Sequence, residues 1–577
     1  MSILVRSHDF HASPACHEHV RRPSLIKGDF FWLTYRYRTP LSCVLCFGVC
    51  NAEIDDEFLF DCFVEYPLVD SARRIGSPAM VLSGRTGSGK TAILRYIEKV
   101  SEHSTVIDPF EMSMSYVSNS DALRFLEAVG ADMDLLFQVL WKHVLCLEFI
   151  RLRWSVDSVE KSKGIFSRIV DTFSRDDRRK KSIAYLQEWQ GKFWITMDEN
   201  IKEITESIER RLHAEVGADI DKFKAGGQYD KRLSREKKSE IVARTKKIIS
   251  SEQLSELHGV IDMLSSAEHG DGMKSFYILI DRLDEKWVDD GVRFRMIRGL
   301  MESLRSFRKI KNLKILVGLR TDVIERVVQE TADLSFQREK FEDLTARLFW
   351  SKADLKLLVE RRIHALFKRQ YTGAPVSFVD VFPQSMGGGK ATFDWMLERT
   401  LMRPRDIIAF VNEAMDAADG QSVINATALR KAEVEFARKR KDALLQEWKS
   451  SYPTLDKMLD LVVSNRKHSV DVVEIIDKID DFCLQICSQN KISHDPIYDT
   501  CKAHIEEGRS DPLTVIGQLV AVLYRAGAIG VKLSPQDRFA YSHSEQPLIS
   551  PELVSADTKV RLHHMLHAAF NLQDRNS

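Results

Sequence analysis

The sequence lacks a net charge, a long apolar run and a high content of cysteine. Its 84 Lys and Arg residues balance 84 Asp and Glu residues, so any binding of nucleic acid must use a local basic patch. No apolar run reaches the ~20 residues that cross a bilayer, so we expect no membrane association through a spanning helix. The nine cysteines are spread over 577 residues without a secretory signal, which indicates reduced thiols and a cytoplasmic location.

The chain is too long for one ordinary core, and its patterning changes along its length. Roughly 100–200 residues per domain predict three or four units. We expect a poorly ordered N-terminal extension, or one that comes from a start codon placed too far upstream, followed by an α/β core that a charged helical insertion interrupts. The expected boundaries are 1–46 for the extension, 47–154 and 266–350 for the core, 155–265 for the insertion, 351–450 for a helical lid and 451–577 for a winged-helix-like domain.

Apolar strands alternate with amphipathic helices in the expected core, which is typical of a parallel α/β sheet. At Glu53–Val64 phenylalanines recur among acidic residues, and we expect a helix there as well. The expected strands are Ala79–Ser83, Thr105–Asp108, Phe276–Ile280 and Leu313–Leu319, and the expected core helices are Thr91–Val100 and Val292–Phe307.

The end of the chain has the pattern of a helix followed by a hairpin. A helix at Leu513–Arg525 precedes strands at Ile529–Leu533 and Arg538–Ser542, which is the order of a winged helix. Such domains often place a helix in the DNA major groove, where phosphate contacts need Lys or Arg. Leu513–Tyr524 contains neither, so we expect this helix to be buried and the domain to contact protein.

A glycine-rich stretch follows the first core strand. The residues from Gly84 to Thr91 fit the pattern G-x-x-x-x-G-K-[ST] without deviation. Glycines let backbone N–H groups surround a phosphate, the lysine reaches the β- and γ-phosphates, and the hydroxyl binds Mg²⁺. We therefore assign an ATP and Mg²⁺ site to Gly84, Gly87, Ser88, Gly89, Lys90 and Thr91.

Three acidic residues follow the apolar strand that ends at Ile280. Asp281 stands where the strand emerges, and a carboxylate there can hold Mg²⁺ through water. Asp284 and Glu285 follow on the turn, close enough to deprotonate an attacking water. We favour Asp284 as the base, because Glu285 can turn toward solvent.

Two arginine positions are candidates for contacts with phosphate. Arg320 ends the strand before Asp322 and can sense a γ-phosphate, but an ion pair with local carboxylates is an equally good interpretation. Further along, Arg403-Pro404-Arg405-Asp406 opens a helix, and its arginines can face a neighbouring phosphate.

The strand motif from Ile280 to Glu285 resembles that of NACHT and KAP members of the STAND NTPases, although Arg282 stands where those families often have a small residue. The chain is also similar to a bacterial P-loop ATPase family often encoded in mobile or phage-defence regions. The resemblance implies a defence or signalling ATPase in which Arg405, with Arg403 as the alternate, reads the nucleotide. The matching stretches are Phe47-Gly48, Ala52-Glu53, Leu140–His143, Gly318–Asp322, Leu348–Ser351, Arg403–Asp406 and Leu562–Met565.

These observations lead to a main hypothesis and two alternatives. The main hypothesis is an ATP-driven switch or motor that acts with a protein partner or by self-association. The first alternative is a nucleic-acid-binding ATPase of DNA repair, recombination or transposition, which would use the basic clusters Arg175–Lys181 and Lys231–Lys247 of the insertion. The second, a P-loop kept only as a scaffold, is disfavoured because Lys90, Thr91 and Asp281 are all present.

Overall fold

The computed structural model describes residues 47–110, 133–156, 177–189, 199–203, 206, 210, 251–265, 274–331 except 286 and 289, 338–370, 376–488, 495–507, 511–543 and 548–572. The expected N-terminal extension and the basic cluster Lys231–Lys247 lie outside these residues, so the predictions made for them stay predictions.

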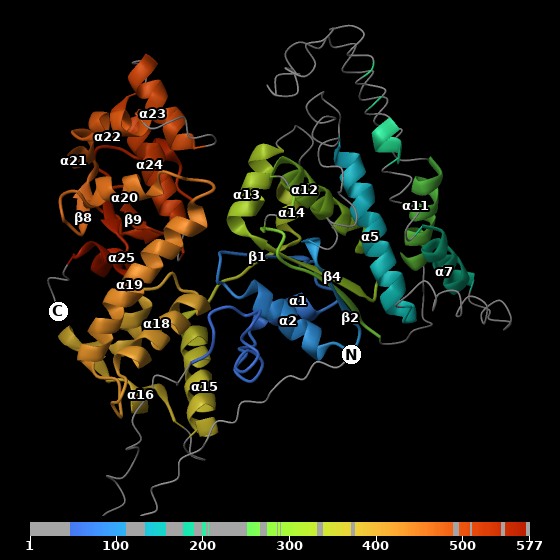
Figure 1. Cartoon of the computed structure of the whole chain (residues 1–577), viewed down its shortest axis with the longest axis horizontal. Coiled ribbons are helices and arrows are strands. Elements are labelled where there is room, and N and C mark those ends of the chain that lie inside the picture. Colours follow the sequence, from blue (N-terminus) through green and yellow to red (C-terminus); the bar gives the residue numbers. More distant parts are fainter. Residues whose placement is uncertain are drawn as a thin grey trace, which may run out of the picture.

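A five-stranded sheet forms the centre of the α/β part (Figure 1). Its strand order is β2-β3-β4-β1-β5, and each neighbouring pair is parallel. This confirms the α/β fold with a parallel sheet. The strands are β1 (Val81–Gly84), β2 (Ser104–Ile107), β3 (Phe276–Ile280), β4 (Leu313–Arg320) and β5 (Thr345–Arg347).

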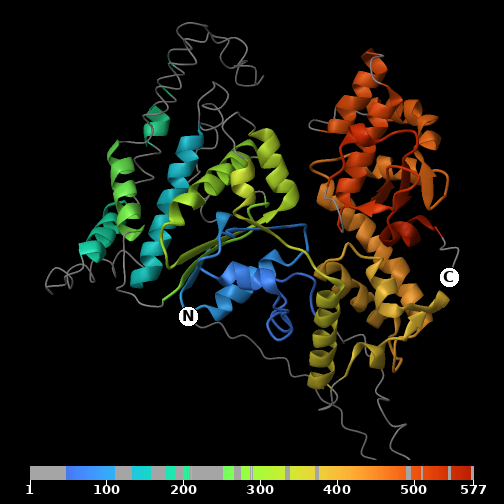
Figure 2. The same ribbon diagram turned by 180° about the vertical axis from the view of Figure 1, so that it is seen from behind.

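Helices cover both faces of this sheet, as Figures 1 and 2 show. Side chains alternate between the faces of a strand, so each strand contributes to two cores. Leu82, Leu279 and Leu316 join one core with the helix α2 (Lys90–Val100). Burial on both sides explains why these strands are nearly continuous apolar runs. The second core, with α5 (Asp134–Trp154) and α12 (Asp290–Phe307), takes Val81, Ile278, Ile280, Ile315, Val317 and Leu319.

Further helices extend this part of the molecule. In the region of the expected insertion, α7 and α11 pack against α5 and against each other. Trp189 of α7 and Leu257 of α11 are buried in the same core as α12. The bounds are α1 (Pro67–Arg73), α7 (Asp177–Trp189), α11 (Ser251–Ser265), α13 (Thr321–Glu330) and α14 (Arg338–Glu342).

The prediction of a helix at Glu53–Val64 is wrong, because this segment forms turns and irregular structure. Its side chains are held by partners in two different regions. The Asp55 carboxylate accepts a hydrogen bond from the Val49 N–H at 3.0 Å and forms a buried ion pair with Arg362. On the other side, the Phe63 ring stacks on Tyr96 of α2 with centroids 4.0 Å apart. These tertiary contacts outweigh the local helical pattern.

A helical region follows β5, in the expected place of the lid. Figures 1 and 2 both show α15 between the sheet and α18. A short hairpin of β6 and β7 separates α16 from α17. The elements are α15 (Lys352–Gln370), α16 (Phe378–Val381), β6 (Ser385–Met386), β7 (Lys390–Ala391), α17 (Thr392–Leu397), α18 (Pro404–Ala417) and α19 (Ala426–Trp448).

The C-terminal region combines helices with a four-stranded antiparallel sheet of order β10-β9-β11-β8. The expected helix and hairpin are present as α24, β9 and β10, and α24 is largely buried as expected. Strands β8 and β11 were not predicted from the sequence; the winged-helix class stays a prediction. The elements are α20 (Leu455–Val463), β8 (Ser469–Asp471), α21 (Val472–Ile476), α22 (Ile479–Cys487), α23 (Pro496–Glu507), α24 (Pro512–Ala526), β9 (Ile529–Lys532), β10 (Ala540–Tyr541), β11 (Lys559–Leu562) and α25 (His564–His567).

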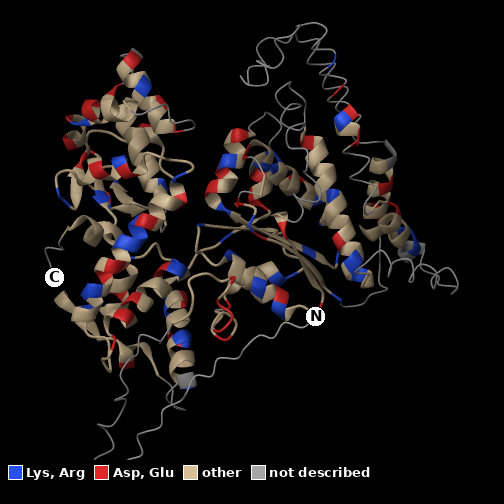
Figure 3. Cartoon of the chain, viewed as in Figure 1, with Lys and Arg blue, Asp and Glu red and all other residues tan. Residues whose placement is uncertain are grey.

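Charged residues of the two signs are not separated by region in the part of the chain that the structure describes. Figure 3 shows basic and acidic residues interspersed along the helices of both the α/β part and the C-terminal part. None of the helices in the described part of the chain has the length and hydropathy that a membrane crossing requires.

Candidate functional site

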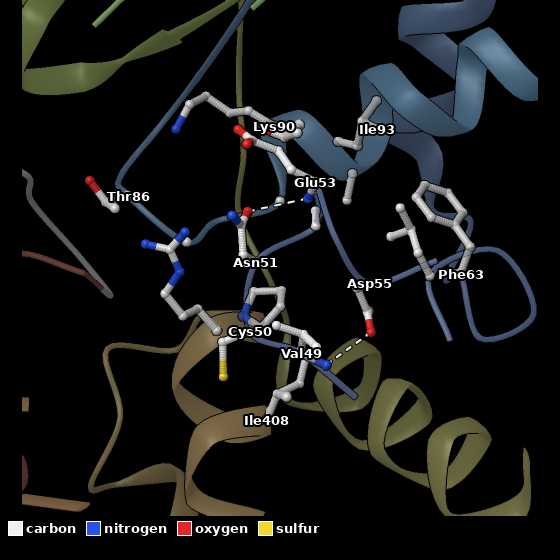
Figure 4. Close-up of a pocket in the computed structure, with 18 of the residues that line it drawn as sticks. Val49, Cys50, Asn51, Glu53, Asp55, Phe63, Thr86, Lys90, Ile93 and Ile408 are labelled. Atoms are coloured by element: carbon white, nitrogen blue, oxygen red, sulfur yellow. Dashed lines mark hydrogen bonds between the residues drawn. The ribbon is translucent and has the colours of Figure 1, made fainter. Parts of the chain in front are cut away.

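A cavity of about 340 Å³ lies where the carboxyl ends of β1, β3 and β4 meet. This edge is where open parallel sheets generally bind ligands. Figure 4 shows this cavity and the side chains around it. Its walls are the glycine-rich loop after β1, the turn after β3, the N-terminal segment 49–66, and the helices α15 and α18.

The loop between β1 and α2 needs its glycines for conformational reasons. Gly87 and Gly89 have φ values of 76° and 98°, in the left-handed region that side chains disfavour. At Gly84 a Cβ atom would lie 2.4 Å from the Ser88 Oγ. The loop then leads into the N-terminus of α2 at Lys90, where free N–H groups and the helix dipole favour an anion.

Lys90 is turned into the loop. Its Nζ donates hydrogen bonds to the carbonyls of Gly84 at 3.0 Å and Arg85 at 3.1 Å. Burial lowers the pKa of Lys90, while the nearby Asp284 and Asp281 act in the opposite direction. Thr86 also borders the cavity, and its buried hydroxyl has no hydrogen-bond partner among the described residues. A buried polar atom without a partner costs free energy, so a ligand with acceptor atoms would stabilise this loop.

Asp281 lies directly after β3 and is held in place by two hydrogen bonds. It accepts hydrogen bonds from the Thr91 side chain and the Arg282 backbone, and burial raises the pKa of its carboxyl. Below it, a Cβ atom on Gly318 of β4 would lie 2.8 Å from the Asp281 Oδ1, so glycine leaves room for the carboxylate. The Thr91 hydroxyl and the Asp281 carboxylate are hard oxygen donors that suit Mg²⁺.

Asp284 and Glu285 both border the cavity, but they differ in exposure. Arg293 donates hydrogen bonds to both of their carbonyls, at 3.2 and 2.9 Å, and so fixes the turn. The Glu285 residue is exposed, whereas the Asp284 side chain is only 26% exposed, and its charge acts to raise the pKa of Lys90. This geometry favours Asp284 as the carboxylate nearer to a ligand on the loop.

Arg320 borders the same cavity but is engaged by a neighbour. Its Nε and NH2 groups donate to the two oxygens of Asp322 at 2.9 and 2.7 Å, and its Nε lies 3.8 Å from Asp284. The local ion pair that the sequence suggested as an alternative is therefore present.

The start of α18 packs directly on the glycine-rich loop. The Arg405 N–H donates to the Gly87 carbonyl at 3.3 Å, and a Cβ atom on Gly87 would lie 2.6 Å from the Arg405 Cβ. Arg403 is buried and donates to the Thr86 carbonyl at 2.6 Å and to Asp406 at 2.9 Å. Within the part of the chain that the structure describes, the Arg405 guanidinium has no hydrogen bond or ion pair, so it is the arginine that can bind a ligand.

Several residues around the cavity were not assigned from the sequence. The Trp350 Nε1 donates to the Ser88 carbonyl at 2.7 Å and so supports the loop from β5. Arg362 of α15 donates to the Phe47 carbonyl at 3.1 Å, and the Asn412 amide of α18 donates to the Gly48 carbonyl at 3.0 Å. These contacts join residues that are hundreds of positions apart, and a single sequence carries no signal for them, although Trp350 lies in one of the stretches that resemble the bacterial ATPase family.

Two comparisons with known proteins match parts of the chain. Residues 353–445, from α15 to α19, match the model of the FunZ-associated C-terminal helical domain. A stretch of 198 residues, or 34% of the chain, is 27% identical to the putative transposon gamma-delta 80.3 kDa protein of Escherichia coli (strain K12). The match covers only 27% of that relative. The chain is thus similar to a FunZ-associated domain in its helical region and distantly similar to a transposon protein over a third of its length.

Proposed function

We propose that this chain is a Mg²⁺-dependent ATPase that works as a nucleotide-driven switch. The observation that carries the proposal is the convergence of Lys90, Thr91, Asp281, Asp284 and Arg405 on one cavity. They come from three segments that are far apart in the sequence, and together they supply cations for phosphate, oxygen donors for a metal and a carboxylate for water. The cavity of about 340 Å³ is within the usual size range of small-molecule sites.

Different parts of the cavity lining suit different parts of a nucleotide. The glycine-rich loop carries N–H groups and a cation, which bind phosphates. The apolar side chains of the lining suit a base and ribose. An ATP molecule placed in this way would contact the glycine-rich loop, the N-terminal segment and α18 at the same time. The apolar lining is Leu59, Phe63, Val64, Tyr66, Ile93, Leu358 and Ile408.

The cycle follows from these contacts. Mg²⁺, held by Thr91 and Asp281, would neutralise phosphate charge, and Asp284 would accept the proton of the attacking water. The Arg405 guanidinium would contact the γ-phosphate before hydrolysis and lose that contact afterwards. Only such a difference in contacts can shift a conformational equilibrium. We propose that the shift is passed to a protein partner or to a second copy, as the resemblance to STAND NTPases implies for defence or signalling.

Turnover in two single variants tests the catalytic assignment. Asp284→Asn should keep ATP binding and slow phosphate release by roughly 10²–10⁴-fold, because it removes the base. The matched control is Glu285→Gln, which changes the exposed neighbour on the same turn and should have a much smaller effect. Phosphate release at the parent rate in both variants would contradict the assignment of the base to this turn.

The similarity to a transposon protein supports a second candidate function. In that case the ATPase would act on nucleic acid in transposition, recombination or repair, through the basic insertion. Lys181 of α7 is exposed and Lys180 is half-buried, and both belong to the first basic cluster. Double-stranded DNA binding, measured by fluorescence anisotropy at two salt concentrations, should be salt-sensitive and weaker in a Lys180→Ala, Lys181→Ala variant. DNA affinity that instead depends on residues 451–577 would contradict this location.

A further inference from the structure

The side chain of Arg85 leaves the glycine-rich loop and enters the C-terminal region. Its NH2 group donates to the Arg525 carbonyl at 2.8 Å and to the Ser542 Oγ at 2.7 Å. Arg525 lies in the last turn of α24, and Ser542 directly follows β10. Arg85, a residue of the proposed phosphate loop, is therefore hydrogen-bonded to residues more than 400 positions further along the sequence.

Gly527 makes room for this contact. It ends α24 in the left-handed conformation, with φ of 83°, which glycine adopts without strain. A Cβ atom at this position would lie 2.8 Å from the Arg85 NH1. The same glycine thus ends the helix and lets the guanidinium pass.

Charges of both signs surround the half-buried Arg85. Burial and the neighbouring Arg403 lower the pKa of Arg85 to about 10, while Glu447, Asp322 and Glu325 act in the opposite direction. A second arginine crosses the boundary in the other direction, because the Nε of Arg525 lies 3.5 Å from Glu325 of α13. The α/β part and the C-terminal region are therefore joined by two arginines, one from each side: Arg85 contacts the C-terminal region, and Arg525 contacts α13.

The main chain of Arg85 contacts the candidate site itself. Its carbonyl accepts the hydrogen bond from Lys90, and the next carbonyl, of Thr86, accepts one from Arg403. If Lys90 turns toward a phosphate, it gives up its bond to the Arg85 carbonyl. Any shift of that peptide moves the residue whose side chain holds α24.

We propose that Arg85 is a positioning residue that couples the state of the glycine-rich loop to the docking of α24 and the hairpin of β9 and β10. This inference rests on the proposed nucleotide site. When the C-terminal region is docked, Lys90 stays hydrogen-bonded to the loop carbonyls of Gly84 and Arg85. Nucleotide binding weakens the hydrogen bonds from Arg85 to the Arg525 carbonyl and the Ser542 Oγ. Thermodynamic linkage makes the effect reciprocal. Docking of the C-terminal region must lower the affinity for nucleotide by the same factor by which nucleotide lowers the equilibrium constant for docking.

Hydrogen exchange of the full chain, with and without Mg²⁺ and ATP, tests this coupling. In the parent protein, ATP should reduce the protection of residues 525–542. The variant Arg85→Ala should lose that protection already without ATP, bind ATP more tightly and show no further change on binding. Arg347→Ala removes an exposed arginine from the neighbouring strand β5 and serves as the matched control, which should behave like the parent.

A second variant keeps the test interpretable if Arg85→Ala does not fold. Ser542→Ala removes one acceptor from the other side of the contact and should give a smaller loss of protection in the same residues. Unchanged protection of 525–542 in both ligand-free variants would overturn the docking role, and an ATP response that persists in Arg85→Ala would overturn the coupling. Failure of the parent protein to bind ATP would instead contradict the proposed function, and the ligand-free comparison distinguishes these failures.

Discussion

The surroundings of Asp281 disfavour the ionised form of its carboxyl. Burial raises the pKa of the carboxyl, so between the unfolded and folded pKa values the folded state holds more protons than the unfolded state. Above that window the buried charge lowers the free energy of unfolding. Such a cost at a cavity is typical of a group kept for binding.

Asp281→Asn should therefore stabilise the ligand-free protein and impair its response to Mg²⁺. We expect a higher Tm at neutral pH, because the substitution removes the buried charge. Differential scanning calorimetry with and without Mg²⁺ and nucleotide measures both effects. The control is Asp56→Asn, whose carboxylate is 73% exposed beside Arg95 and which should leave both quantities unchanged. A lower Tm for Asp281→Asn would contradict this account of the charge.

At the scale of single elements, α18 is fixed by one buried carboxylate. Asp406 is fully buried and accepts from Arg403 at 2.9 Å, Arg440 of α19 at 2.8 Å and the Leu401 N–H at 3.0 Å. These partners hold the pKa of Asp406 below its usual value despite burial. Because Arg403 also reaches the Thr86 carbonyl, the cluster joins α18, α19 and the glycine-rich loop.

Asp406→Ala should destabilise the helical region strongly, because it leaves the buried Arg403 and the half-buried Arg440 without their shared carboxylate. Removing one partner of a buried ion pair typically costs about 3–5 kcal/mol. Chemical denaturation should show this loss, whereas Glu435→Ala, which breaks an exposed pair with Arg438 on α19, should leave the midpoint unchanged. Equal midpoints for the parent and Asp406→Ala would show that the cluster does not stabilise the fold.

The sequence predicts those elements whose pattern is local. The strand at Phe276–Ile280 is bounded as predicted, and the helix expected at Val292–Phe307 is α12, because buried strands and amphipathic helices have recognisable periods. The prediction of a helix at Glu53–Val64 was wrong because the structure of this segment depends on Arg362 and Tyr96, which lie elsewhere in the chain. Strands β8 and β11 are only three and four residues long, too short for a periodic signal.

The candidate site could be predicted in part for the same reason. Lys90, Thr91 and Asp281 are recognisable because glycine spacing and a strand end mark them within a few residues. The N-terminal wall of the cavity and the anchoring of Arg85 could not be predicted, since both depend on contacts between distant parts of the chain.

At the scale of the whole molecule, the proposed switch depends on Arg405. This arginine lies on α18, in the region that matches the FunZ-associated domain, and its main chain contacts Gly87 of the loop. Since its guanidinium has no partner among the described residues, the fold should tolerate its loss. Arg405→Ala should keep the parent Tm without nucleotide, keep much of the ADP affinity, and lose the preference for ATP.

Isothermal titration with ATP and ADP, combined with hydrogen exchange of α18, measures this effect. Arg438→Ala, an exposed arginine on α19, is the matched control and should retain the preference. A drop in Tm of Arg405→Ala that is equal with and without nucleotide would indicate a structural role only. Equal responses to ATP and ADP in the parent protein would contradict the switch.

We propose that the loop from Gly84 to Thr91 binds the phosphates of ATP, and the most direct test is the equilibrium affinity of the purified chain for Mg²⁺ and ATP. Lys90→Ala should weaken binding by at least roughly 10–100-fold, because a charge-assisted hydrogen bond contributes about 1.5–3 kcal/mol. Lys99→Ala, an exposed lysine on the same helix, should bind like the parent. If Lys90→Ala binds ATP as tightly as the parent and Lys99→Ala, the loop is not the nucleotide site.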